Sequence, residues 1–406
     1  MDIIIIGGGA SGLMAAIAAA SVPHNHITIL ERQARVGRKL LSTGNGRCNL
    51  SNGNLSPLHY HGQDPDFVKP SLEAFGLSET LDLFHSLGLL TVQEPNGKIY
   101  PWSDQAGSVL DVLRFAIQKP NITLRTAFEV RKVQKSPEGF RVVGTEETLT
   151  AQKLIIACGG LAGTALGGSM SGYQLLRSFG HKCSKLHPAL VQVKSSYPRC
   201  ASLKGIRANC RLWVTKDHKT VIENQGEVQF TQYGLSGPAI FEVSRFLCQE
   251  KGDWVCHLDL LPQMEKSALL AHVKQRQALA PTLEAGDLLT GTIHNRLGRT
   301  VVQEAGIGLT VPAASLTEQD LEALVSVTKD LNLTLTELMG MDSAQVTAGG
   351  ILTAEFDPTT MESRLCPGLY ACGEVLDIDG DCGGFNLQWA WSSGHAAGTN
   401  AGKESA

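Results

Sequence analysis

The sequence predicts an α/β fold: a Rossmann-type nucleotide-binding domain, split by an insert made of a β-barrel-like part and a small helical part. The first observation is a βαβ pattern with a glycine-rich turn at the start of the chain. The second is the return of buried-strand patterns closed by glycines, once before the middle of the chain and once near its end. The third is a change in the hydrophobic pattern between these strands, which first alternates residue by residue and then has the period of a helix.

The domain boundaries follow from these changes in the hydrophobic pattern. Residues 191–260 alternate in short strand-like pieces separated by turn residues, and residues 263–338 carry leucines and valines at helical spacing. The predicted units are a discontinuous nucleotide-binding domain at 1–190 and 343–406, a β-barrel-like insert at 191–262, and a helical subdomain at 263–342.

The first βαβ unit is the clearest local pattern. Asp2–Ile6 is a continuous apolar run, typical of a parallel strand that is buried on both faces. An Ala-rich helix follows the glycine turn and extends to about Ser21, and a second strand at Ile27–Leu30 ends at Glu31. This order is that of a nucleotide-binding motif.

The remaining elements of the nucleotide-binding domain are less regular. Helices are expected near 67–75, 78–87 and 107–118, with Ser78 as the N-cap of the second and Gly88 just past its end. Residues 122–150 predict a small antiparallel meander. Buried strands are expected at 153–157 and 367–372, and a closing helix from about Phe385.

Composition excludes several classes of protein. The 406 residues carry a net charge of -4, and the ten cysteines include no C-x-x-C pair, so we expect reduced thiols in a cytoplasmic protein. No secretory signal is predicted, because the first residues lack a positive segment and form a strand. The longest apolar stretch, about 13–22, is too short to span a bilayer, so no membrane association is expected. The oligomeric state stays open.

The turn Gly7-x-Gly9-x-x-Gly12, which includes Ala10 and Ser11, has the spacing of a dinucleotide fingerprint. Its first glycine permits the tight turn, its second lets the backbone approach a pyrophosphate, and its third lets helix and strand pack closely. Glu31 follows at the tip of the second strand, where a carboxylate accepts hydrogen bonds from the ribose of an adenosine. A bound dinucleotide is therefore predicted.

Later segments favour FAD over NAD. Gly159-Gly160 closes one buried strand and Gly373-Glu374 closes another, as in FAD enzymes of the glutathione-reductase-like fold. Glu374 is placed to accept from the ribityl chain. Gly383-Gly384 then begins a helix whose N-terminus is expected to face the flavin and stabilise negative charge on the reduced ring.

The segment 37–49 combines glycines, cations and small polar residues, and it is expected to run beneath the pyrophosphate toward the ring. The predicted FAD-binding residues are Gly7, Gly9, Ala10, Ser11, Gly12, Glu31, Arg32, Gly37, Arg38, Lys39, Gly44, Asn45, Gly46, Arg47, Cys48, Asn49, Val130, Cys158, Gly159, Gly160, Gly373, Glu374, Gly383, Gly384, Phe385, Asn386 and Leu387.

Several short motifs make a family resemblance specific. They are Gly37-Arg-Lys39, Gly46-Arg-Cys-Asn49, Phe230-Thr-x-x-Gly-Leu-Ser-Gly-Pro238, Thr347-Ala-Gly-Gly350, Gly373-Glu-Val-Leu-Asp377 and Gly383-Gly-Phe-Asn386. Over nearly its whole length the chain resembles the BaiN/YhiN-like flavoproteins, also described as aminoacetone oxidase family FAD-binding enzymes. The resemblance implies a split FAD domain with a β-barrel insert and a small helical subdomain.

The resemblance also implies FAD and NAD(P)H-linked oxidoreductase chemistry without fixing one substrate. Members act in reduction of uridine to dihydrouridine in ribosomal RNA, in reduction of conjugated double bonds in bile-acid intermediates, and in oxidation of aminoacetone. In the two reductions, hydride goes to the electron-poor end of a C=C and an acid protonates the adjacent carbon. The chain has no second glycine fingerprint, so NAD(P)H is expected to act as a transient electron donor.

Three residues are candidates for the proton donor. Cys48 comes first, because Arg47 and Lys39 are expected to tune its pKa, although it equally fits a packing residue beside the cofactor. Cys382 and Asp381, just before the flavin-facing helix, come next. No metal site is predicted, because no histidine has metal-ligand spacing with cysteine or aspartate. The histidines that include His24, His59, His61, His187, His257 and His395 are expected to be solvated or core residues.

Two basic segments bear on the substrate. Residues 32–47 carry five cations and no acid, and residues 194–221 carry seven cations and one acid. They fit a solvated surface or a strip that binds phosphates. The second interpretation favours ribosomal RNA as the substrate slightly over a small molecule, such as an enone or an amine. A flavin-bearing redox sensor with little turnover is a third hypothesis, and Trp389 and Trp391 fit core positions better than a stacking site.

Overall fold

The computed structural model describes residues 1–247 and 252–404. The chain divides into two compact units, one formed by 1–187 with 344–406 and the other by 188–343. The sequence pattern placed these limits at 190/191 and 342/343. Each unit has its own hydrophobic core.

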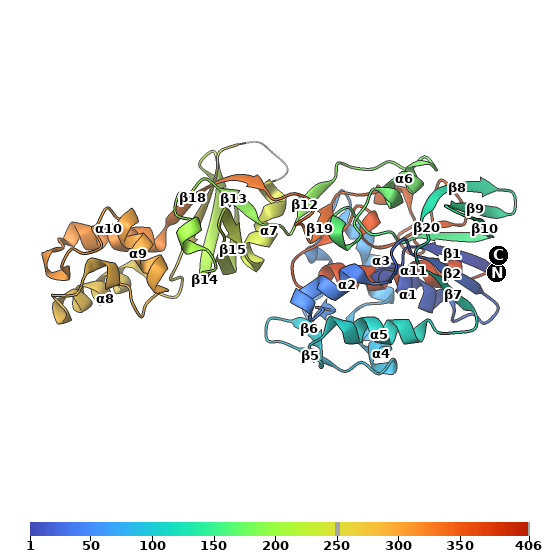
Figure 1. Ribbon diagram of the computed structural model, residues 1–406, viewed down its shortest axis with the longest axis horizontal. Coiled ribbons are helices and arrows are strands. Elements are labelled where there is room, and N and C mark those ends of the chain that lie inside the picture. Colours follow the sequence, from blue (N-terminus) through green and yellow to red (C-terminus); the bar gives the residue numbers. More distant parts are fainter. Residues whose placement is uncertain (248–251, 405–406) are drawn as a thin grey trace. The chain divides into compact units, whose positions relative to one another are not determined.

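A five-stranded parallel sheet forms the centre of the first unit, in the order β20-β11-β1-β2-β7. Its strands are β1 (Asp2–Ile6), β2 (His26–Leu30), β7 (Ile122–Arg125), β11 (Lys153–Ile156) and β20 (Leu369–Ala371). The strands at the centre are buried on both faces, which is why they appear as continuous apolar runs. The sheet joins residues from both ends of the chain (Figure 1).

Two helices pack on one another beside this sheet: α1 (Ala10–Ala19) and α11 (Phe385–Ala401). A Cβ added at Gly394 would lie 2.4 Å from the carbonyl oxygen of Ser11, and one added at Gly398 would lie 2.2 Å from that of Ala15. The glycines therefore let the two backbones approach closely. This contact fixes the start of α11 relative to the glycine-rich turn that precedes α1.

Smaller elements surround the sheet. The helices are α2 (Arg38–Ser42), α3 (Lys69–Ala74), α4 (Leu77–Ser86), α5 (Ala106–Ala116) and α6 (Ser171–Arg177). The strands are β3 (Ser51–Asn52), β4 (Tyr60–His61), β5 (Thr91–Gln93), β6 (Lys98–Pro101), β8 (Val130–Ser136), β9 (Gly139–Gly144), β10 (Thr148–Ala151), β19 (Val346–Ala348) and β21 (Asp379–Gly380). Strand β12 (His187–Ala189) lies at the boundary between the units.

Two local predictions were wrong. Only β8, β9 and β10 form the antiparallel meander, because the first strand assigned to it, β7, pairs in parallel with β2. Ser78 does not cap α4: the N-cap is Gly76, whose backbone N–H donates to the Glu79 carboxylate over 2.9 Å. The helix begins at this glycine because Glu79, at position N3, reaches back with its carboxylate to bind the N-cap amide.

The second unit contains a closed barrel in the strand order β13-β16-β15-β14-β17-β18, with a helical cluster inserted along the chain between β17 and β18 (Figure 1). Its strands are β13 (Val193–Ser195), β14 (Arg207–Lys216), β15 (Lys219–Phe230), β16 (Gly234–Ser236), β17 (Trp254–Asp259) and β18 (Leu331–Leu338). Its helices are α7 (Pro238–Leu247), α8 (Lys266–Leu279), α9 (Asn295–Glu304) and α10 (Glu318–Lys329).

Strand β18 corrects the assignment of 331–338 to the helical part. Leu331, Leu333 and Leu335 alternate with exposed residues and point into the barrel core. The period of two therefore dominates over the leucine content that suggested a helix. Among the described residues, no helix is long and apolar enough to cross a membrane.

Candidate functional site

The glycine-rich turn shows which of its glycines the fold itself requires. A Cβ on Gly7 would lie 2.2 Å from the Ala157 carbonyl oxygen, and one on Gly12 would lie 1.9 Å from the Gly7 carbonyl oxygen. Gly9 is different, because a Cβ there would have no heavy atom within 4 Å and its φ of -84° is ordinary. The fold gives no reason for glycine at position 9, whereas a phosphate group that approaches the backbone does.

The N-terminus of α1 supports that interpretation. Gly9 is the N-cap, no side chain caps the helix, and its first turn carries no acidic residue. The first backbone N–H groups of a helix have no intrahelical partners and carry partial positive charge. Ala10, Ser11 and Gly12 belong to this turn, so the start of α1 suits a pyrophosphate.

Glu31 lies at the end of β2, as predicted. One carboxylate oxygen accepts from the Gly8 N–H over 2.8 Å and the other from the Gln33 N–H over 2.7 Å. These bonds fix the carboxylate beside the glycine turn and leave lone pairs for further donors. The arrangement suits the paired hydroxyls of an adenosine ribose.

Lys39 and Glu374 come together from opposite ends of the chain. The Lys39 Nζ lies 2.7 Å from one carboxylate oxygen of Glu374, and the other oxygen accepts from the Thr347 N–H over 2.9 Å. Gly160 adjoins this pair, since a Cβ there would lie 2.3 Å from the Glu374 carboxylate. Three of the predicted cofactor-binding segments therefore meet at one place, and their donors and acceptors fit the sugar chain and phosphates of FAD.

The other predicted cofactor residues lie on several turns and strands of the first unit. Gly37 has a φ of 70° and precedes α2, Gly44 and Asn45 are in left-handed conformations in the next turn, and Gly46 and Gly159 have open space where a Cβ would be. Asn49 accepts from the Ile99 N–H, and Val130 begins β8. Arg32 and Arg38 donate to the carbonyl oxygens of Gly167 and Ala165 over 2.8 Å and 3.1 Å.

Cys48 does not have the properties expected of a proton donor. Its side chain is fully buried, and burial raises the pKa of its thiol to about 12. Arg47, which was expected to tune it, instead pairs with Glu94 over 2.9 Å and with Asp104. Lys39 is held by Glu374, so neither cation reaches the sulfur. The structure therefore supports the packing interpretation of Cys48.

Cys158 and Cys382 occupy different surroundings. Burial also raises the pKa of Cys158, to about 12, and its thiol contacts the Ile6 carbonyl oxygen at 3.4 Å. Cys382 is partly exposed and follows Asp381 in the turn before α11.

Asp381 lies in a cluster that the sequence did not reveal. Its two carboxylate oxygens lie 2.9 Å from the Nδ1 of His59 and 2.6 Å from the Nε2 of His61. Burial alone would raise the pKa of the Asp381 carboxyl, but the bonds from His61 and His59 outweigh it and the pKa lies below its ordinary value. Asp381 is therefore ionised at neutral pH, which contradicts its assignment as the proton donor itself.

Three further sets of contacts brace this cluster. Strand β4 pairs with β21, and the Asp381 N–H donates to the His59 carbonyl oxygen over 2.9 Å. The His59 ring stacks on the Phe385 ring with 4.2 Å between centroids and 19° between planes. Asn386 holds both backbone groups of Gly380, at 2.8 Å and 2.7 Å. The histidine pair is thus attached to the first turn of α11.

No group of three or more His, Cys, Asp or Glu residues able to hold a metal ion occurs in the described part of the chain. The imidazoles of His59 and His61 each form a direct hydrogen bond with the Asp381 carboxylate. Trp389 and Trp391 are core residues: both are buried, and their indole N–H groups donate to the carbonyl oxygens of Gly373 and Leu50.

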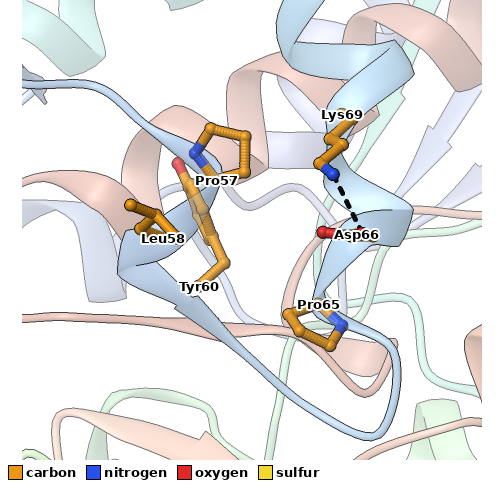
Figure 2. Close-up of a pocket in the computed structure, with 6 residues that line it drawn as sticks. All are labelled: Pro57, Leu58, Tyr60, Pro65, Asp66 and Lys69. Carbon is orange, nitrogen blue, oxygen red and sulfur yellow. Dashed lines mark ion pairs between the residues drawn. The ribbon is translucent and has the colours of Figure 1, made fainter.

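A hollow of about 390 Å³ lies beside the segment that carries His59. Figure 2 shows Pro57, Leu58 and Tyr60 on one side of it and Pro65, Asp66 and Lys69 on the other, with an ion pair between the last two. None of these residues belongs to the predicted FAD-binding set. Leu58 is 88% exposed, so the rim of the hollow is apolar on the side of Pro57 and Leu58.

Part of the basic segment at 194–221 is neutralised by acids from neighbouring elements. Its ion pairs include Lys194–Glu337 at 2.8 Å, Arg199–Glu304 at 2.7 Å, Arg207–Glu227 at 3.4 Å and Arg211–Glu223 at 2.8 Å. Cations that alternate with such partners create little net positive potential. This supports the solvated-surface interpretation of 194–221.

Sequence reasoning missed His59, His61 and Thr347. Thr347 joins two segments, because its hydroxyl accepts from the backbone of Leu161 and Ala162 while its own N–H donates to Glu374. The two-residue spacing of His59 and His61 was not a sufficient signal, because His59 ends a short 3₁₀ helix and only His61 lies in the extended strand β4.

Comparisons with known proteins bear on the whole chain. The model of the family described as HI0933-like protein Rossmann domain matches residues 1–400. A 3-dehydro-bile acid delta(4,6)-reductase from Clostridium scindens is 40% identical over 401 residues, which are 98% of each chain. A ribosomal RNA dihydrouridine synthase from Escherichia coli K12 is 33% identical over 396 residues, 97% of this chain and 96% of that relative.

One solved structure with the same fold is a 3-ketosteroid delta1-dehydrogenase from Sterolibacterium denitrificans. It has a TM-score of 0.53, covers 99% of both chains and is 12% identical. At that identity the likeness concerns the fold alone.

Proposed function

Since the chain belongs to the HI0933-like family of Rossmann-domain flavoproteins, as its resemblance to the BaiN/YhiN-like flavoproteins indicated, we propose that this FAD-dependent oxidoreductase uses NAD(P)H to reduce a C=C bond conjugated to a carbonyl group. The observation that carries the proposal is the end-to-end similarity to two relatives whose names describe the same bond change. One saturates ring double bonds of a 3-oxo bile acid, and the other saturates the uracil ring. In both, a carbonyl withdraws electrons from the bond that is reduced.

The residues present suit that chemistry. FAD supplies a hydride when it is bound and reduced. The start of α1, Glu31 and the Lys39–Glu374 pair would hold its phosphates and sugars. The uncapped N-terminus of α11 would stabilise negative charge on the reduced ring.

Small molecules are the substrate class that the charges favour. The two basic segments were the reason to prefer RNA, and in the insert Arg199, Arg207 and Arg211 are paired with glutamates on neighbouring elements. The relative with 40% identity also acts on a small molecule by its name. We therefore propose an apolar cyclic enone as the acceptor.

Uridine in ribosomal RNA is the second candidate, and the relative with 33% identity supports it. Its uracil ring presents the same conjugated bond, so the chemistry at the flavin would be shared. The two candidates differ in what binds the rest of the substrate, and RNA binding would depend strongly on salt.

The test separates the two half-reactions. The holoenzyme is bleached anaerobically with NADPH or NADH and then mixed either with a 3-oxo-4-ene steroid or with ribosomal RNA that lacks dihydrouridine. We expect the steroid to restore the flavin absorbance and to gain two mass units. Reoxidation by RNA alone, with dihydrouridine at one site, would establish the second candidate. Bleaching without reoxidation by either acceptor would contradict both.

A further inference from the structure

The cluster of Asp381, His59 and His61 is more elaborate than a structural clamp requires. One carboxylate receives two imidazoles, and all three side chains stay partly exposed, at 27%, 35% and 25%. The other histidine–carboxylate pair of this unit differs in this respect, because the His181 side chain is fully buried between Glu355 and Ser363.

The free nitrogen of each ring defines what the cluster offers. The Asp381 carboxylate is hydrogen-bonded to the Nδ1 of His59 and to the Nε2 of His61. Neither ring makes another hydrogen bond within the described chain. The Nε2 of His59 is therefore available to solvent or a ligand. An imidazole whose Nδ1–H is held by a carboxylate has a fixed tautomer and a fixed ring orientation.

The position of His59 connects it to the reaction. Its ring stacks on Phe385, which begins the helix whose N-terminus is assigned to the flavin, and its backbone binds Asp381 in the preceding turn. The segment that carries it also forms one wall of the hollow in Figure 2.

Resting on the reduction proposed above, we propose that His59 supplies the proton for the carbon next to the carbonyl group, with Asp381 and His61 as positioning residues. The substrate gains a hydride at the carbon farther from the carbonyl and a proton from the His59 imidazolium at the nearer carbon. The C=C bond becomes a single bond, NAD(P)H is the ultimate reductant, and the imidazole regains its proton from water.

Other titratable groups face the cluster. Tyr60 contacts Phe385, and burial followed by the charge of Asp381 raises the pKa of its phenol far above the working range. Asp379 lies on β21 opposite His61, and Cys382 follows Asp381. Across the hollow, Lys69 and Asp66 pair with each other.

The test uses substitutions that keep the hydrogen bonds. Asparagine imitates the Nδ1 donor and glutamine the Nε2 donor, so H59N and H61Q retain contacts with Asp381 but carry no acid. With the holoenzyme, we expect H59N to slow acceptor reduction about 100-fold or more, D381N about 10-fold or more, and H61Q less than 10-fold. Bleaching by NADPH should stay within about threefold in all variants, as should every rate in the control H85N, which alters an exposed histidine on α4.

A second readout needs no turnover. The absorbance of the bound oxidised flavin is followed against pH in the wild type, H59N and D381N. We expect a pH-dependent transition in the wild-type absorbance that is absent in H59N, because asparagine has no ionisable group, and smaller in D381N, because a carboxylate no longer holds the His59 ring in place. A wild-type enzyme that reduces neither acceptor would contradict the proposed function, while the flavin titration would still decide on His59. The inference is overturned if H59N keeps the wild-type rate of acceptor reduction, or if it keeps the wild-type flavin transition.

Discussion

Replacing Gly9 by alanine separates the needs of the cofactor from those of the fold. The added Cβ has no protein atom within 4 Å and φ is ordinary, so the fold loses little. Alanine is a poorer N-cap than glycine but restricts the unfolded chain, and these effects leave the free energy of unfolding within about 1 kcal/mol.

The affinity for FAD should change much more. A methyl group at this position would push the pyrophosphate away from the N–H groups of α1. Losing two charge-assisted hydrogen bonds, at about 1.5 kcal/mol or more each, costs about 3 kcal/mol and raises the Kd of FAD about 100-fold or more. The assay is titration of the apoprotein with FAD, followed by flavin fluorescence.

Two other glycines provide controls in the same unit. Gly107 lies in α5 with open space around its Cβ, so G107A should leave the affinity for FAD unchanged and raise stability by about 0.5–1 kcal/mol. Gly12 lies against the Gly7 carbonyl oxygen, so G12A should reduce stability as well as binding. An apparent Kd within about threefold of wild type in G9A would refute the placement of the pyrophosphate.

Three further variants test other parts of the structure. C48A should keep turnover within about threefold and lower stability by about 1 kcal/mol, as measured by steady-state kinetics and urea unfolding; a 100-fold loss of turnover would restore Cys48 as a proton donor. The double variant R207A/R211A should leave stability almost unchanged, because both pairs are exposed, and leave any RNA binding unaltered in a filter assay over a range of salt; weaker binding with a smaller salt slope would restore the phosphate-binding interpretation. Burial lowers the pKa of His181 despite its bond to Glu355, so the unfolded chain takes up protons more readily and stability should decrease as the pH drops below about 6.5; thermal unfolding of H181N should show a weaker pH dependence, and an identical one would assign the effect elsewhere.

The sequence predicted the nucleotide fold well because its determinants are local. Gly7, Gly9 and Gly12 are spaced within a single turn, and Glu31 follows at the end of the next strand. Helix α11 and the Gly373-Glu374 turn were found for the same reason, since each combines a glycine pattern with an adjacent apolar run.

What the sequence did not predict depends on long-range pairing. His59 and Asp381 are separated by 322 positions, and nothing local indicates that β4 and β21 bring them together. The charges of β14 seemed unbalanced because their glutamate partners lie on the next strand, in a register that only the folded barrel sets. Arg47 was expected to tune the pKa of Cys48, but adjacency along the chain does not decide which way the Arg47 side chain points.

The interruption of the first unit also has a consequence for its synthesis. Strand β20 and helix α11 complete the parallel sheet and the flavin side of the site, yet they follow the whole second unit along the chain. At roughly 5–20 residues per second, the ribosome needs on the order of 10–30 s to make that unit. During this interval the edge of β11 that later pairs with β20 is exposed, while the barrel and its helices are able to fold. Cofactor capture is therefore expected to be a late, post-synthetic event, and a ribosome stalled once the second unit has left the exit tunnel should display a folded barrel but no bound flavin.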